Sequence, residues 1–293
     1  MRKLLLQLDS SRLPSVFDRV VAYDGGADEV MGYGGVAEVD VRDLVHGLIF
    51  TRGPKDLKNS AVFIGGADMS AGERLLAAAQ KAFFGPFRVS TMLDSNGSNT
   101  TAVAAVEKLT RAVEGGVAGR RVLVAAGTGP VGTRAAGLLA RAGAEVTITS
   151  PKPEDGTRVA DLVHQRFGGE VHAVTMHDAG EAKRVIDAAR PEILLNCGPA
   201  GVMLVPRSAW ARRPGLVAAA DLNAVPPLGV EGIEVNDDGV EREGAKVFGA
   251  LGVGNFKMKL HKACIARLFE SSDAVLDAES ISDIARDLAR GRA

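Results

Sequence analysis

Short apolar runs in the middle of the chain alternate with segments whose apolar positions recur at helical spacing. The runs that predict strands are Val122–Ala126, Val146–Thr149, Val171–Thr175, Ile193–Asn196 and Leu216–Asp221. The segments that predict helices between the first four of them are Val131–Ala142, Arg158–Phe167 and Ala182–Ala189. Strands that alternate with helices form a parallel sheet covered by helices. The pattern therefore predicts an α/β domain over residues 115–255.

The N-terminal part of the chain shows the same alternation in a less regular form. Apolar runs predict strands at Lys3–Gln7, Val16–Ala22, Gly47–Phe50 and Ala61–Gly65, and helical spacing predicts a helix over Ser70–Phe83. Glycine-rich connections separate these segments, as is usual between the elements of an α/β fold. Residues 1–114 are therefore predicted to form a second, smaller α/β domain.

Two further helices are predicted to connect these domains. Ala102–Val113 carries an apolar stripe at helical spacing and leads into the central domain. Another helix is predicted from about Asn255 to Phe269, and a last amphipathic helix follows, with Asp277 or Ser280 as its N-cap. We expect residues 256–293 to return to the first domain, so that the central domain is an insertion in it.

The strongest local motif follows the first central strand. Val122–Ala126 leads into Gly127-x-Gly129-x-x-Gly132, and a helical pattern starts at once. In this context the three glycines are a dinucleotide-binding fingerprint, because they allow a tight turn, close approach of a pyrophosphate and close helix packing. The motif predicts a Rossmann-like domain in which Gly127, Thr128, Gly129, Pro130, Val131 and Gly132 bind a nicotinamide dinucleotide. The alternative is a glycine-rich turn in a plain α/β domain, since the chain has 35 glycines.

The end of the second central strand bears on which dinucleotide is bound. NAD-specific domains place a carboxylate there, about 20 residues after the first glycine. This chain has Ser150 and Lys152 instead. A hydroxyl and an ammonium suit a 2′-phosphate, so the sequence favours NADP over NAD. The alternatives are that both nucleotides are used, or that Lys152 is an ordinary solvated lysine.

Polar residues also follow two later strands. Asn196 ends one strand, and Asp221 and Asn223 follow another. Ligands of open α/β sheets bind beyond the carboxyl ends of the strands, so these three residues are further candidates for cofactor binding. The alternative is a turn initiated by Asp or Asn. Pro226 and Pro227 stiffen the same loop, which is a sequence in which cis bonds occur.

Two more segments carry candidate chemistry. Asp94–Thr101 packs hydroxyls, amides and a carboxylate before a helix, and we expect it to hydrogen-bond a polar heterocycle; the alternative is an elaborate N-cap. Residues 249–261 form a second glycine-rich entry into a helix, where Lys257 and His261 share one face and Lys259 lies on another. Lysines at a helix start oppose the helix dipole. They therefore indicate a bound anion or a functional role, with ordinary surface lysines as the alternative.

The composition excludes several classes of protein. Apolar residues make up 46% of the 293 residues, and the net charge of −1 with no basic cluster argues against nucleic-acid binding. No apolar run nears the about 20 residues of a membrane helix, and Gln7 and Asp9 interrupt the apolar start before a signal segment forms. Cys197 and Cys264 match no metal-ligand spacing. We expect a cytoplasmic protein that binds no metal, membrane or nucleic acid.

Taken together, these segments resemble the bacterial NAD(P)-dependent methylene-tetrahydromethanopterin dehydrogenases of one-carbon metabolism. The segments that carry the resemblance are Pro14–Asp18, Tyr23–Asp28, Phe83–Ser90, Met92–Thr101, Gly127–Gly132, Asn223–Gly229 and Phe248–Phe269. The resemblance implies an α/β pterin domain and an NADP domain with a cleft between them. It implies reversible hydride transfer from 5,10-methylene-tetrahydromethanopterin to NADP, which gives the methenyl cation. The alternatives are a methylene-tetrahydrofolate dehydrogenase and a dinucleotide-sensing protein without catalysis.

The resemblance also implies roles for individual residues and an assembly. Asp18, Lys257 and Lys259 are the candidate catalytic residues. The candidate substrate-binding residues are Asp24, Asp94, Asn96, Asn99, Thr100 and His261. A homo-oligomer, plausibly a trimer, is expected. One departure is that an Arg-Lys pair of the family reads Pro151-Lys152 here, which weakens strict NADP selectivity unless Arg158 substitutes.

Overall fold

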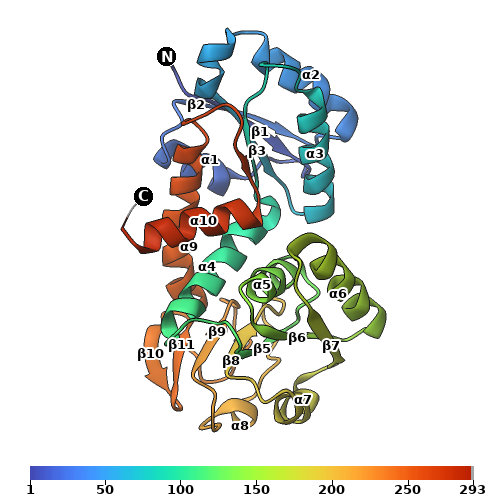
Figure 1. Cartoon of the computed structure of the whole chain (residues 1–293), viewed down its shortest axis with the longest axis vertical. Coiled ribbons are helices and arrows are strands. Elements are labelled where there is room, and N and C mark those ends of the chain that lie inside the picture. The colour runs from blue at the N-terminus through green and yellow to red at the C-terminus, as the bar shows by residue number, and fades with distance from the viewer. Residues whose placement is uncertain (292–293) are drawn as a thin grey trace. The chain divides into compact units, whose positions relative to one another are not determined.

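The computed structural model describes residues 1–291, which form two compact units (Figure 1). Unit 1 comprises Met1–Thr100 together with the described chain from Met258 onward, and unit 2 comprises Thr101–Lys257. The boundaries fall inside two long helices, α4 (Ser98–Ala112) and α9 (Ala250–Arg267). Each of these helices therefore begins in one unit and ends in the other. No helix within the described residues is long and apolar enough to cross a membrane.

Unit 1 is built on a parallel sheet of five strands in the order β12-β4-β3-β1-β2. The strands are β1 (Leu4–Asp9), β2 (Glu29–Gly34), β3 (Ser60–Gly65), β4 (Ser90–Leu93) and β12 (Val275–Leu276). The helices are α1 (Val16–Asp24), α2 (Glu38–Ile49), α3 (Met69–Ala82) and α10 (Ala278–Ala289), with 3-10 turns at Pro54–Asn59 and Ser95–Gly97. Leu6 and Leu8 of β1 pack with Val41, Val45 and Leu75 of α2 and α3, and these side chains form the core on one face.

Two strands predicted from the sequence in unit 1 are wrong. Val16–Ala22 lies in helix α1, because the Ser15 hydroxyl accepts the N–H of Asp18 at 3.1 Å and caps a helix there. Gly47–Phe50 is the end of α2. The apolar run of α2 recurs at helical spacing when it is read from its start, and a four-residue window conceals that period.

Other predictions in unit 1 are confirmed. Lys3–Gln7 overlaps β1, Ala61–Gly65 lies in β3 and Ser70–Phe83 matches α3 within a residue at each end. Asp277 is the N-cap of α10, where its carboxylate accepts the N–H of Ser280 at 3.1 Å. Edge strand β2 was missed, because its apolar positions are interrupted by glycines.

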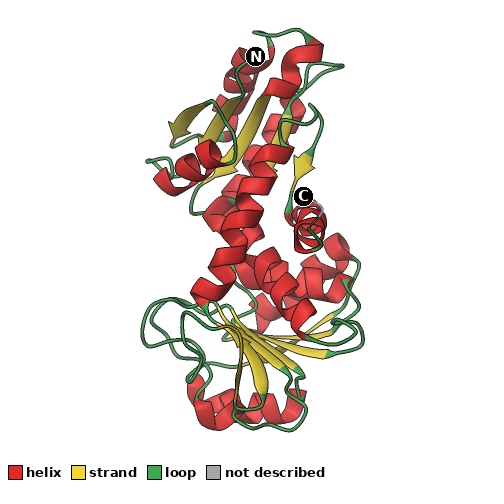
Figure 2. Ribbon diagram, turned by 90° about the vertical axis from the view of Figure 1, so that its left-hand side faces the viewer, coloured by secondary structure: helices red, strands yellow, loops and turns green. Residues whose placement is uncertain are grey.

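Unit 2 is built on a sheet of seven strands in the order β10-β11-β9-β8-β5-β6-β7, in which only β10 runs antiparallel to its neighbour. The strands are β5 (Arg121–Ala125), β6 (Glu145–Ser150), β7 (Val171–Thr175), β8 (Ile193–Asn196), β9 (Ala218–Asp221), β10 (Asp238–Arg242) and β11 (Ala245–Phe248). The helices are α5 (Pro130–Arg141), α6 (Pro153–Phe167), α7 (Ala182–Ala189) and α8 (Arg207–Trp210), with a 3-10 turn at Ala179–Glu181. Figure 2 shows helices on both faces of this sheet.

The alternating pattern of the central chain predicted unit 2 well. Strands β5 to β9 and helices α5 and α7 lie within two residues of their predicted bounds, whereas α6 begins five residues before the predicted Arg158. The hairpin of β10 and β11 was not predicted, because β10 is largely exposed and lacks an apolar face. The prediction of an α/β fold is confirmed, and both sheets are mainly parallel.

Candidate functional site

The fingerprint loop joins the end of β5 to the start of α5. A Cβ added at Gly127 would lie 2.5 Å from the Cβ of Ile148, and one at Gly132 would lie 2.7 Å from the carbonyl oxygen of Ala126. Real Cβ atoms do not approach other atoms so closely, so both positions require glycine. Pro130 occupies the first turn of α5, where a backbone N–H would have no acceptor within the helix, so proline costs no hydrogen bond there.

The loop leaves open space and unsatisfied donors at its centre. A Cβ at Gly129 would meet nothing closer than the oxygen of Ala126 at 3.8 Å. Within residues 1–291, the backbone N–H groups of Thr128, Val131 and Gly132 have no hydrogen-bond partner. Free N–H groups at a helix N-terminus bind phosphate groups. The residues present therefore fit the pyrophosphate of a dinucleotide.

The end of β6 presents one exposed cation and no carboxylate. The buried Ser150 hydroxyl donates to the carbonyl of Lys152 at 2.7 Å and accepts its N–H at 3.2 Å. Ser150 thus shapes the turn, while the Lys152 side chain is exposed. Arg158, one turn into α6, forms an ion pair with Asp155 at 3.4 Å. Lys152 is the better placed of the two cations for a 2′-phosphate, and its contact with one stays a prediction.

Asn196, Asp221 and Asn223 form a buried hydrogen-bond network. Asn196 Nδ2 donates to Asp221 Oδ1 at 2.8 Å, and the other Asp221 oxygen accepts the N–H of Val230 at 3.0 Å. Asn223 accepts the N–H of Val225 at 2.9 Å and donates to the carbonyl of Pro227 at 3.1 Å. The Pro226–Pro227 bond in this loop is cis. These side chains join the loops beyond β8 and β9, and their contact with a nucleotide stays a prediction.

The polar run before α4 is mostly an internal framework. Asp94 accepts the N–H of Thr100 at 2.9 Å and its hydroxyl at 2.6 Å, and Asn99 donates to the carbonyl of Leu93 at 2.6 Å. All three polar side chains are fully buried. Asn96 differs, because it has a left-handed backbone with φ of 55° and an exposed side chain. Asn96 is therefore the member of the predicted set that a ligand reaches without rearrangement.

Two predicted site residues each lie near the end of β3. The N–H of Asn96 donates to the carbonyl of Gly66 at 2.6 Å. Asp18 Oδ2 lies 3.6 Å from the position of a Cβ on Gly65. Strands β1 and β3 are neighbours, and the chain continues from them to opposite sides of the sheet, to β2 and to β4. Such a switch point, at the carboxyl ends of the strands, is where open α/β sheets bind ligands.

Asp9, which the sequence analysis left out of the site, supports this edge. Its carboxylate accepts the N–H of Ser11 at 2.8 Å and that of Ser15 at 3.1 Å, and it is buried. It therefore holds the loop from β1 into α1, the helix that carries Asp18. The position of Asp9 near the end of a predicted strand was visible in the sequence, where a turn residue was the favoured interpretation of an isolated aspartate.

The remaining candidates lie on or against α9. Lys257 is half-buried and Lys259 is exposed. His261 is fully buried, with its ring stacked on Phe63 at 5.6 Å between centroids. Asp24 forms an ion pair of 2.7 Å with Lys262. His261 and Asp24 thus both support packing around α9, and their contact with a substrate stays a prediction.

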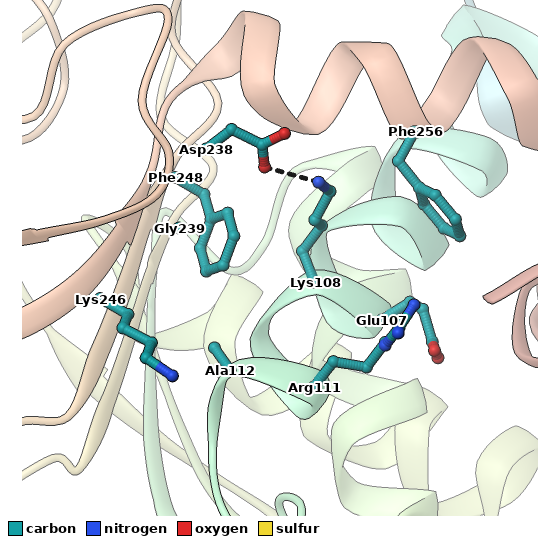
Figure 3. Close-up of a pocket in the computed structure, with 9 residues that line it drawn as sticks. All are labelled: Glu107, Lys108, Arg111, Ala112, Asp238, Gly239, Lys246, Phe248 and Phe256. Atoms are coloured by element: carbon teal, nitrogen blue, oxygen red, sulfur yellow. Dashed lines mark hydrogen bonds and ion pairs between the residues drawn. The ribbon is translucent and has the colours of Figure 1, made fainter. Parts of the chain in front are cut away.

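A pocket of about 380 Å³ lies between the end of α4, the β10–β11 hairpin and the start of α9 (Figure 3). The Lys108 ammonium, in this pocket, pairs with Asp238 at 2.5 Å and lies 5.7 Å above the Phe248 ring. Arg111 stands in the last turn of α4, where the helix dipole favours a cation. The Lys108 charge in the pocket is thus paired within the fold, and we assign no ligand to the pocket. Among the described residues, no group of three or more His, Cys, Asp or Glu side chains could hold a metal ion.

Comparison with known proteins relates the chain to one family. Residues 16–96 match a family model described as methylene-tetrahydromethanopterin dehydrogenase, N-terminal. The chain is 33% identical over 281 residues to the NAD(P)-dependent methylenetetrahydromethanopterin dehydrogenase of Methylorubrum extorquens strain AM1, covering 93% of each protein. It is 50% identical over 289 residues to the protein named bifunctional protein MdtA of the same strain, covering 98% of this chain and 99% of that protein. The chain belongs to the methylene-tetrahydromethanopterin dehydrogenase family.

Solved structures place this family member among Rossmann-like dehydrogenases by fold. The ligand-free 5-ketofructose reductase of Gluconobacter sp. strain CHM43 superposes with a TM-score of 0.53 at 12% identity, over 98% of this chain and 99% of that one. Quinate dehydrogenase of Corynebacterium glutamicum in complex with NAD superposes with a TM-score of 0.50 at 14% identity, over 99% of each chain. At these identities the likeness concerns the fold alone.

Proposed function

We propose that this family member catalyses reversible hydride transfer from 5,10-methylene-tetrahydromethanopterin to NADP, with NAD as a second acceptor, in the oxidation of formaldehyde-derived one-carbon units. The observation that carries the proposal is the fingerprint loop, whose N–H groups at Thr128, Val131 and Gly132 have no partner within residues 1–291. The NAD(P)-dependent relative, at 33% identity over 93% of both proteins, supports the pterin as the hydride donor.

The proposed reaction requires little acid–base catalysis by the protein. A C–H bond of the methylene carbon breaks, and the hydride leaves with the electron pair to the nicotinamide ring. The products are the methenyl cation and the reduced nucleotide. Because the cation is stabilised by resonance between two nitrogens, no proton has to be removed. The protein's task is then to bind, orient and exclude water.

The nucleotide side of the proposal uses unit 2. The free N–H groups of the fingerprint loop hold the pyrophosphate, and Gly129 keeps its approach open. The exposed Lys152 holds the 2′-phosphate. Because a lysine also tolerates the absence of that phosphate, the same site accepts NAD with lower affinity. Asn196, Asp221 and Asn223 shape the neighbouring loops through their network.

The pterin side of the proposal uses unit 1 and α9. Asp18 and Asn96, at the end of β3, accept from and donate to the amide-and-amine edge of the pterin. The Asp18 carboxylate also favours the positive charge that develops on the methenyl product. Lys257 and Lys259 bind polar groups of the pterin or its tail. Asp94, Asn99 and Thr100 hold the turn that presents Asn96.

Steady-state kinetics with two pterins and two nucleotides test this function. We expect turnover of methylene-tetrahydromethanopterin with NADP and NAD, and a lower kcat/KM with methylene-tetrahydrofolate. A higher kcat/KM with the folate would make the protein a folate dehydrogenase. Nucleotide binding without turnover of either pterin would make it a dinucleotide sensor. Light scattering of the purified protein tests the homo-oligomer, for which we propose a trimer, and fractionation of cells tests the proposed cytoplasmic location.

A further inference from the structure

Thr149 stands beside the point where the chain leaves β5 for the fingerprint loop. The β5–β6 ladder ends with the pair Val124 and Ile148. Beyond that pair, Thr149 Oγ1 accepts the N–H of Ala126 at 2.9 Å, and the Thr149 carbonyl accepts the N–H of Gly127 at 3.0 Å. One residue of β6 thus binds the first two N–H groups of the turn.

Ala126 explains why a side-chain acceptor is needed here. Its φ of 53° lies in the left-handed region, which residues with a Cβ rarely adopt. The Thr149 carbonyl is occupied by the N–H of Gly127, so the Thr149 hydroxyl supplies the acceptor for the N–H of Ala126. Thr149 is itself buried, with 1% of its surface exposed. The acceptor of this bond is therefore shielded from solvent.

We infer that Thr149 is a positioning residue for the dinucleotide. By holding Ala126 and Gly127, it keeps the chain reversal in place and leaves the N–H groups of Thr128, Val131 and Gly132 directed to a pyrophosphate. The inference rests on the proposed function, because it takes a dinucleotide as the ligand of the loop. The inference gives β6 a second role, which is to hold the fingerprint loop, in addition to the proposed contact of Lys152 after β6 with the ribose phosphate.

Valine and serine at position 149 separate the hydroxyl from the shape of the side chain. Thr149→Val keeps the branched shape and removes the acceptor, whereas Thr149→Ser keeps the acceptor. Thr147→Val is the matched control, because Thr147 lies on the same strand, is half-buried and makes no hydrogen bond through its side chain within residues 1–291. NADPH and NADH fluorescence titrations measure Kd, and steady-state kinetics measure KM for each substrate.

We expect Thr149→Val to raise Kd for NADPH and KM for NADP about tenfold, the loss that one buried hydrogen bond accounts for, without a change in KM for the pterin. Thr149→Ser is expected to bind NADPH within about threefold of the wild type, which is at most about half of that effect in free energy. The amide of Ala126 is expected to exchange hydrogen faster in Thr149→Val, measured without nucleotide. Thr147→Val is expected to match the wild type in each measurement.

Three outcomes decide the inference. Wild-type Kd in a folded Thr149→Val protein overturns it, and so does equal weakening of nucleotide and pterin binding that Thr149→Ser fails to restore. If Thr149→Val does not fold, Thr149→Ala replaces it as the variant without a hydroxyl, with the same expected Kd and the same overturning result. Wild-type protein that binds neither NADPH nor NADH overturns the proposed function and this inference together.

Discussion

Asn196 Nδ2 donates to Asp221 Oδ1 at 2.8 Å and joins the carboxyl ends of the neighbouring strands β8 and β9. The two residues are partners in the parallel register of those strands, and both are buried. A Cβ on Gly229 would lie 1.8 Å from the same amide nitrogen, so the returning loop packs directly on this bond. The contact fixes the loop edge beside the proposed nucleotide site.

The first prediction concerns this pair. The Asp221 carboxylate accepts hydrogen bonds from the Asn196 side chain and from the N–H groups of Asn223 and Val230. Asp221→Asn replaces one of its oxygens by an NH2 group, which then faces one of these donors. We expect the free energy of unfolding to fall by about 1–3 kcal/mol, the cost of unsatisfied buried groups, in urea denaturation. A double-mutant cycle with Asn196→Ala is expected to show coupling between the two sites. Unchanged stability with a raised KM for the nucleotide would instead indicate direct cofactor contact.

The second prediction contrasts two glycines of the fingerprint. Gly129→Ala adds a Cβ into open space, so we expect a folded protein with wild-type melting temperature and a KM for NADP raised by at least about tenfold, since the pyrophosphate approaches there. Gly127→Ala forces a Cβ to 2.5 Å from Ile148 and is expected to lower the melting temperature as well. Thermal melts and initial rates measure both effects. If Gly129→Ala binds NADP normally, the phosphates lie elsewhere.

The third prediction concerns the choice of nucleotide. Lys152→Gln removes the exposed ammonium at the end of β6, and we expect KM for NADP to rise about tenfold, equivalent to about 1.4 kcal/mol of binding free energy, with KM for NAD unchanged. Lys246→Gln is the control, because Lys246 is also exposed on unit 2 and has no partner within residues 1–291. Equal effects on the two nucleotides would contradict a role with the 2′-phosphate.

The fourth prediction separates two asparagines of one polar run. Asn96→Gly removes an exposed amide and keeps the left-handed backbone with φ of 55° accessible. We expect a raised KM for the pterin, by about threefold to tenfold for one lost hydrogen bond, with a smaller loss of stability than in Asn99→Ala. Asn99→Ala removes a buried donor to Leu93 and is expected to lower the melting temperature. Kinetics with saturating NADP and thermal melts of both variants provide the comparison. A pterin KM that responds to neither change would remove this run from the substrate site.

The fifth prediction is a pH dependence of stability. The Arg120 guanidinium donates to Glu192 at 2.8 Å and holds the pKa of that carboxyl below its usual range, and the N–H of Arg121 acts in the same direction. A lowered folded-state pKa stabilises the protein above the ordinary glutamate pKa, and this contribution is lost as pH falls through the folded pKa. We expect Glu192→Gln to lower the melting temperature at pH 7.

The difference between Glu192→Gln and the wild type is then expected to shrink in acid, below the ordinary glutamate pKa of about 4.3. Glu145→Gln is the control and should show no such difference. Glu145 is exposed at the start of β6, and its side chain has no hydrogen-bond or ion-pair partner within residues 1–291. A difference that is independent of pH would assign the effect to packing rather than to the charge.

Local sequence was sufficient for the alternating strands and helices of unit 2 and for the fingerprint loop. The strand before Gly127, the glycine spacing and the helix after Pro130 are each specified within a few residues of chain. A buried parallel strand appears in the sequence as a continuous apolar run. A glycine cannot be replaced where a Cβ atom would clash with neighbouring atoms. These signals need no knowledge of distant contacts.

Other features depended on residues far apart in the sequence. Asp94 and Asn96 read alike as polar residues before a helix. Only the folded chain, with β3 passing beside the turn, buries one and exposes the other.

The sequence by itself therefore determined the α/β class, the fingerprint and the family, because these depend on local period and on residues that permit no substitute. The tertiary structure decided which polar residues are buried in hydrogen bonds of the fold and which stay exposed. Thr149, Asp221 and Asp9 hold loops through bonds to N–H groups that become unpaired only where strands end. Strand order sets which ends are neighbours, and no single stretch of sequence encodes that order.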